Sequence, residues 1–130
     1  MSKQTLYFDY LKEEGFVPHL DNDGDIVFKV EGISYLLFQA EDDPEYFRLT
    51  LPFFWQIESP AERQRVMAAA TTVNAEVKVV KIYVVDDHAW AGVEMLIDPI
   101  ENFRQVFPRC LRLLRHGVSR FTEIMKTPVQ

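Results

Sequence analysis

The chain has 130 residues, a formal net charge of -6, 48% hydrophobic residues and a single cysteine. This length fits one domain, residues 1–130, that buries roughly two thirds of its unfolded surface, and the hydrophobic content excludes a disordered chain. One cysteine excludes an internal disulfide framework, and the sequence shows neither a signal-peptide core nor an apolar run that spans a membrane. We therefore expect a soluble protein of the cytoplasm with no membrane partner.

Charge is divided unevenly along the chain. Residues 1–62 carry 13 acidic and 4 basic side chains, whereas residues 99–130 carry 2 acidic and 6 basic ones. Nucleic-acid binding depends on basic side chains that neutralise phosphates. An acidic chain of this kind is not expected to have nucleic acid as its partner, although its last segment is basic.

The first amphipathic pattern predicts a helix over residues 2–14. Its apolar face consists of Leu6, Tyr7, Tyr10 and Leu11. Gly15 supplies a left-handed stop, and Phe16 follows at the position from which a Schellman-type contact returns to the helix. Residues 16–20 form a short extended run, which Pro18 confines to a sheet edge or a connection.

Three strand-like runs follow this helix. The polar residues 21–25 predict a turn that leads into a strand over residues 26–30. The Glu-Gly pair at residues 31–32 is a two-residue connection, so residues 33–39 should pair back as a hairpin. After a second polar turn, apolar and polar side chains alternate over residues 46–51, which indicates one buried face and one wetter face.

A second helix and two more strands come next. Residues 59–62, Ser-Pro-Ala-Glu, form a capping box with proline at the first helical position. They predict a helix over residues 60–75. Residues 77–85 are rich in β-branched side chains and predict a strand, which turns at residues 86–88 and returns over residues 89–97.

The last helix begins at a second capping pattern, residues 98–101. Its apolar face contains Phe103, Phe107, Cys110, Leu111, Leu114, Val118, Phe121 and Met125, and the opposite side is basic. Pro108 lies inside this pattern and predicts a kink, or a break near Phe107. The resulting order, α-βββ-α-ββ-α, predicts an α+β fold in which helices pack on one antiparallel sheet.

Three aspartates in the first polar turn suggest a calcium loop. Counting from Asp21, glycine comes at the fourth position instead of the sixth, and the twelfth position is Gly32 instead of glutamate. The motif therefore fails twice. We interpret Asp21, Asp23 and Asp25 as a solvated turn without a metal ion.

The other chemically active residue types are scattered. His19, His88 and His116 have no spacing that brings metal ligands together. Cys110 lies on the apolar face of the last helix and is interpreted as a core residue. The single glycines form no phosphate-binding loop. We therefore expect no catalytic residues, no metal and no cofactor, and a function that is not enzymatic.

Residues 51–57 leave the strand through a proline and contain three aromatic residues. Phe53, Phe54 and Trp55 fall in what the pattern predicts to be a connection before the second helix. We interpret two of them as sealing the sheet against helices and one as an exposed docking contact. Trp90 is a second candidate contact because small and charged residues share its strand face.

The basic face of the last helix contains five arginines. Such a face is most often simply solvated. Beside an acidic body it also suits an acidic partner, or the acidic half of a second copy. We assign Arg112 and Arg115 to the charged rim of a binding surface.

Several short segments resemble the YbjN-like family of bacterial proteins: residues 14–18, residues 23–32, the Leu51-Pro52 strand exit and residues 74–78. The resemblance covers nearly the whole chain and consists of turn-and-strand signatures. It implies a fold like that of type III secretion chaperones, a small antiparallel sheet flanked by helices and commonly dimeric. It also implies a protein-binding role, as a chaperone or a sensory-transduction regulator, and it transfers no catalytic residues.

These observations lead to three hypotheses. The first is a cytoplasmic homodimer that binds a protein or peptide client through its sheet surface, exposed aromatics or a strand edge. The alternative is a small-molecule-binding or enzymatic domain with a pocket between sheet and helices, where carboxylates or histidines would converge. The third is a structural subunit whose apolar patch is wholly covered in the dimer.

Overall fold

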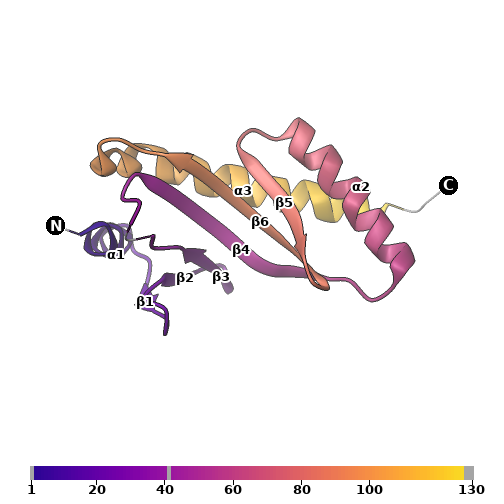
Figure 1. Cartoon of the computed structure of the whole chain (residues 1–130), viewed down its shortest axis with the longest axis horizontal. Helices are drawn as coiled ribbons and strands as arrows, with labels where there is room; N and C mark the ends of the chain where they lie inside the picture. Colours follow the sequence, from indigo (N-terminus) through magenta and orange to yellow (C-terminus); the bar gives the residue numbers. More distant parts are fainter. Residues whose placement is uncertain (1, 41, 128–130) are drawn as a thin grey trace.

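The computed structural model describes residues 2–40 and 42–127 and confirms the α+β class and the predicted element order. Its strands form one antiparallel sheet in the order β1-β2-β3-β4-β6-β5 (Figure 1). The elements are α1 (Lys3–Glu13), β1 (His19–Leu20), β2 (Ile26–Val30), β3 (Ile33–Leu37), β4 (Tyr46–Gln56), α2 (Pro60–Glu76), β5 (Val80–Val85), β6 (His88–Leu96), the 3-10 helix η1 (Ile100–Asn102) and α3 (Phe103–Lys126). None of the described helices is both long and apolar enough to cross a membrane.

Helix α1 ends as its sequence predicts. The N–H of Gly15 donates to the carbonyl of Lys12 at 3.1 Å, and the N–H of Phe16 donates to the carbonyl of Leu11 at 2.9 Å. These two bonds make a Schellman motif, and Gly15 has the positive φ of 92° that the motif requires. The ring of Phe16 then packs 5.3 Å from that of Phe28 on β2.

The predicted hairpin of β2 and β3 is also confirmed. Val30 pairs with Ile33 across a two-residue turn. The turn residues Glu31 and Gly32 have φ values of 52° and 82°, which is the left-handed pair typical of a tight hairpin. Just before β2, the Oδ1 atom of Asp21 accepts the N–H groups of two following residues and holds the predicted turn.

Strand β4 is longer than the alternating pattern predicts. It continues through the three aromatics to Gln56, so their placement in a connection is wrong. The pairing with β6 shifts between Leu51 and Trp55, which leaves three residues of β4 opposite Trp90 of β6. This β-bulge takes up the extra residues around Pro52 and lets pairing resume.

Helix α2 begins with the predicted cap, since the Ser59 hydroxyl accepts the N–H of Glu62 at 3.0 Å. Near its other end, α2 covers part of the outer edge of β5. The side-chain amide of Asn74 donates to the carbonyl of Ile82 at 3.0 Å and accepts its N–H at 2.8 Å. Asn74 therefore satisfies both backbone groups that an edge strand leaves free at Ile82.

Replacing Asn74 with alanine is expected to lower the free energy of unfolding by about 1 kcal/mol, because two hydrogen bonds to a partly buried backbone are lost. Urea unfolding followed by tryptophan fluorescence measures the change. Thr71→Ala is the matched control, since it removes an exposed side-chain bond within the same helix, and its effect should be smaller. Wild-type stability in the alanine variant would contradict this role of Asn74.

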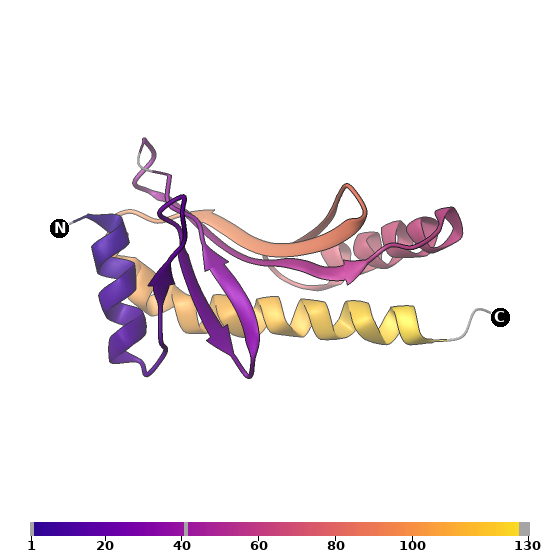
Figure 2. The same cartoon turned by 90° about the horizontal axis from the view of Figure 1, so that it is seen from below.

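Helix α3 lies along the length of the molecule against the sheet (Figure 2). The predicted break near Phe107 is wrong, because the helix is continuous from Phe103 to Lys126. Pro108 lies in its second turn, and there the missing N–H removes a single hydrogen bond, which would have gone to the carbonyl of Arg104. The ring of Phe107 packs 5.5 Å from that of Tyr10 on α1, so packing holds this end of the helix.

Candidate functional site

One face of the sheet is not covered by any described helix. Figure 2 shows α1 and α3 on one side of β4 and β6, and the opposite side open. Side chains alternate between the two sides along each strand. Phe47, Leu49 and Val93 are fully buried on the helix side. On the other side, the following residues form what we call the open sheet face: Tyr46, Arg48, Phe53, Lys81, Tyr83, His88, Trp90 and Glu94. Thr50 lies on the same side of β4 but is fully buried.

The bulge in β4 sends its three aromatics to different sides. Phe54 and Trp55 both face α3, where their ring centroids lie 5.1 and 5.6 Å from that of Phe121. Phe53 lies on the open sheet face instead, with its ring 4.7 Å from that of Trp90. Two of the three aromatics therefore seal the sheet against a helix and one is exposed, as the sequence analysis expected.

Phe53 is exposed at an energetic cost. Its side chain is 61% exposed, and its φ of 52° is in the left-handed region, which disfavours residues with a β-carbon by about 1–2 kcal/mol. Trp90 beneath it is partly buried, and its indole N–H has no partner among the described residues. Trp90 thus offers its ring, and not a donor, to this surface.

The open sheet face contains one ion pair among the described residues, between Lys81 and Glu94. Glu94 accepts hydrogen bonds from Lys81 and from the hydroxyl of Tyr46. The bond from Lys81, followed by that from Tyr46, holds the pKa of Glu94 below its ordinary value. Burial, with the bond to Glu94, raises the pKa of Tyr46 to about 12. Arg48 donates to the uncharged hydroxyl of Tyr83 at 2.9 Å, so this part of the face carries one positive charge in excess, that of Arg48.

Two sheet edges are poorly suited to strand addition. On β5, the amide of Asn74 already occupies the backbone groups of Ile82. On β4, β3 pairs only as far as Thr50, and beyond it Pro52 has no N–H and the bulge distorts the strand. A client would therefore reach the open sheet face more readily than either of these edges.

Arg112 and Arg115 lie on α3, on the other side of the sheet from Phe53 and Trp90. The structure does not bring them together with those aromatics. Arg115 forms an ion pair with Glu31 of the β2–β3 turn at 2.7 Å. Arg112 is exposed and has no ion pair within residues 2–40 and 42–127.

Most of the other arginines of α3 also serve the fold. Arg104 pairs with Glu13 of α1 at 3.0 Å, and Arg120 pairs with Glu76 of α2 at 2.9 Å. Together with Arg115, these residues connect α3 to α1, to the β2–β3 turn and to α2. The density of arginine on α3 is therefore explained largely by contacts within the chain.

The three aspartates of the first polar turn are close together, with one carboxylate oxygen of each within 4.8 Å of the others. Their oxygens hold the backbone: Asp21 accepts the N–H of Asp23 at 2.9 Å, and Asp25 accepts the N–H of Gln39 at 2.7 Å. Burial raises the pKa of Asp25, although the bond from Gln39 opposes the shift. These contacts agree with the interpretation as a turn.

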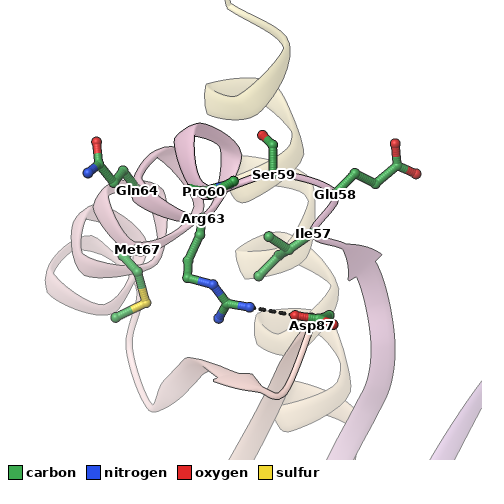
Figure 3. A pocket seen from close by; sticks show the side chains of 8 residues that line it. All are labelled: Ile57, Glu58, Ser59, Pro60, Arg63, Gln64, Met67 and Asp87. Carbon is green, nitrogen blue, oxygen red and sulfur yellow. Dashed lines mark hydrogen bonds and ion pairs between the residues drawn. The ribbon is translucent and has the colours of Figure 1, made fainter.

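A hollow of about 720 Å³ lies at the start of α2 (Figure 3). Its side chains offer little that converges. Arg63 and Asp87 point toward one another and form an ion pair at 2.6 Å, whereas Glu58 and Gln64 point away from it. The Ser59 hydroxyl is used as the helix cap. The described residues around the hollow therefore do not include the gathered carboxylates or histidines by which a catalytic pocket would be recognised.

Tyr83 and His88 also belong to the open sheet face, although neither was predicted from the sequence as a binding residue. The ring of His88 lies 5.2 Å from that of Phe53, and that of Tyr83 lies 6.4 Å from that of Trp90. Their positions follow from period-two alternation on either side of the β5–β6 turn, so the signal was present. The shift in β4 has no comparable signal.

A comparison of the chain with models of protein families finds no match, and a comparison with curated proteins finds none either. The geometry of the open sheet face is therefore the basis on which a function is proposed.

Proposed function

We propose that this chain is a non-enzymatic protein- or peptide-binding module, chaperone-like or regulatory, that acts as a cytoplasmic homodimer. The open sheet face is its binding surface. The observation that carries the proposal is Phe53, an exposed aromatic residue in a disfavoured backbone conformation whose ring is in edge contact with that of Trp90.

The aromatics of this face have the properties of interface anchors. Large rings bury much area while losing few rotamers, and residues of this type dominate the affinity of protein interfaces. Phe53 and Trp90 form such a pair, and Tyr83 and His88 extend it. Of the neighbouring charges, Lys81 and Glu94 pair with one another, whereas Arg48 bonds only to the uncharged Tyr83 hydroxyl. A client segment that covers the cluster would therefore combine apolar or aromatic side chains with an acceptor for Arg48.

We include in this proposal that the chain is related to YbjN-like proteins and shares the fold of type III secretion chaperones. The element order α-βββ-α-ββ-α agrees with it. Light scattering tests the dimer, which should have twice the 15.2 kDa mass of the chain. A monomer at all concentrations would contradict this part of the proposal and leave the assignment of the face intact.

Replacing Phe53 with asparagine tests the binding face. Asparagine tolerates a positive φ, so the variant should keep a free energy of unfolding within about 1 kcal/mol of wild type. Peptides selected against the wild-type protein from a random display library should bind the variant about thirtyfold more weakly, the loss typical of an interface hot spot. Fluorescence anisotropy with the selected peptides measures both affinities.

The matched control is Val17→Asn. Val17 is another apolar residue, 82% exposed, and it is distant from Phe53 in the sequence. This variant should bind the selected peptides with wild-type affinity. Equal affinities for the Phe53 variant and the wild type would remove Phe53 from the binding surface and leave the proposal without its main support.

A further inference from the structure

Three basic side chains that have no ion pair among the described residues lie on or beside α3, at one end of the sheet. Within the described residues, Arg109, Arg112 and Lys78 have no ion pair, although Arg104, Arg115 and Arg120 on the same helix all have one. Arg109 and Arg112 are one helical turn apart on α3, and Lys78 lies in the connection from α2 to β5.

Arg109 and Lys78 border a groove of about 310 Å³ between α3, this connection and β6. Four of the eight residues that line it have apolar side chains: Val79, Met95, Val106 and Leu113. Among residues 2–40 and 42–127, no carboxylate lines it. The groove therefore combines apolar lining residues with a positively charged rim.

The groove also lies beside an open part of the sheet. The ladder between β5 and β6 ends where Val80 pairs with Val93, whereas the ladder between β4 and β6 continues to Leu96. Figure 1 shows β6 extending past the beginning of β5. The last residues of β6 therefore have a neighbouring strand on one side only, which is the arrangement that an added extended segment requires.

Val79, at the edge of this groove, shares two properties with Phe53: an exposed apolar side chain and a positive φ. It is 51% exposed and has a φ of 54°, which is a true outlier for a β-branched residue. The structure thus holds a second apolar side chain outward in a disfavoured conformation, at the edge of the groove.

We propose that this groove is a second docking site, independent of the open sheet face, for an acidic segment of a partner protein. The segment binds extended beside the end of β6, places apolar side chains on Val79, Val106 and Leu113, and directs carboxylates to Lys78, Arg109 and Arg112. Nucleic acid fits less well, because the chain carries a net charge of -6 and three cations are few for a phosphate backbone.

The probe is a fluorescein-labelled peptide in which glutamate alternates with leucine and valine, titrated at low salt and followed by anisotropy. A peptide with lysine in place of glutamate should bind far more weakly. The double variant Lys78→Glu/Arg109→Glu should bind the acidic peptide at least about tenfold more weakly, because both rim charges are reversed. The control Lys12→Glu/Lys126→Glu changes the net charge equally outside the groove and should keep most of the affinity.

Methionine methyl resonances, observed by NMR with 13C labelling, locate the bound peptide. The Met95 methyl should shift on titration, whereas those of Met67 and Met125 should not. Phe53→Asn should bind this probe with unchanged affinity, which separates the groove from the open sheet face.

Three outcomes would overturn the proposal. They are unchanged affinity in the groove double variant, an unperturbed Met95 methyl, and equal binding of the lysine peptide. If Lys78→Glu/Arg109→Glu instead converts a dimer to a monomer in light scattering, the occupant is a second copy of this chain and the assignment to a separate partner is wrong.

Discussion

Replacing Phe121 with alanine is expected to lower the free energy of unfolding by about 3–5 kcal/mol, the loss typical of a buried phenylalanine. Phe121 is fully buried, and its ring contacts those of Phe54 and Trp55 in β4. Its removal leaves a cavity between α3 and the bulged part of the strand. Because a domain of this size is marginally stable, the variant should be largely unfolded at modest urea concentrations.

Urea unfolding followed by circular dichroism measures this change. Phe121→Leu keeps most of the volume and should cost clearly less than Phe121→Ala, whereas Phe53→Asn on the other side of the same strand should cost little. A loss below about 1 kcal/mol in Phe121→Ala would contradict the packing of α3 against β4. An equal loss in Phe53→Asn would show that the exposed phenylalanine stabilises the fold.

Replacing Gly117 with alanine is expected to lower the free energy of unfolding by about 1–3 kcal/mol. Helix propensity alone predicts the opposite sign, since alanine is favoured over glycine inside a helix by about 1 kcal/mol. A β-carbon at Gly117 would lie 2.8 Å from the Cγ1 atom of Val80 on β5, which is too close. Val80 is short, β-branched and buried, so it cannot turn aside.

The companion variant Val80→Ala tests this explanation. In the double variant the new methyl group of residue 117 occupies space that Val80 has vacated. The double variant should therefore lose less stability than the sum of the losses in the two single variants. Urea unfolding of both single variants and the double variant gives the coupling free energy. Strict additivity, or a stabilised Gly117→Ala, would show that α3 and β5 do not approach as closely as described.

Local sequence patterns predicted the parts of the fold that local chemistry controls. Gly15 ends α1, residues 31–32 turn the first hairpin, and Ser59 caps α2. In each case the residue type matches one backbone conformation and acts within a few residues. The alternation over residues 46–51 likewise identified a buried face, because the period of two is independent of the partner strand.

What escaped prediction depends on residues distant in sequence. The bulge in β4 exists only in relation to Trp90 of β6, so no local pattern showed that Phe54 and Trp55 would face α3. The ion pair of Arg115 with Glu31 joins residues 84 positions apart. No local pattern predicts such a pair, and Arg115 was therefore interpreted as a binding residue. Pro108 was expected to break the last helix because the sequence does not show that Phe107 packs against α1 and holds the helix in place.

The position of α3 in the chain has a consequence for biosynthesis. The ring of Tyr7, near the beginning, lies 4.2 Å from that of Phe103 at the start of the 24-residue α3. Until the ribosome has made that segment, the apolar side of β4 and β6 can be covered only in part, by α1, whose Tyr7 ring lies 6.1 Å from that of Phe47. The nascent polypeptide then exposes residues such as Val93. A translational pause before residue 103 would therefore leave a partly folded, aggregation-prone intermediate that depends on molecular chaperones.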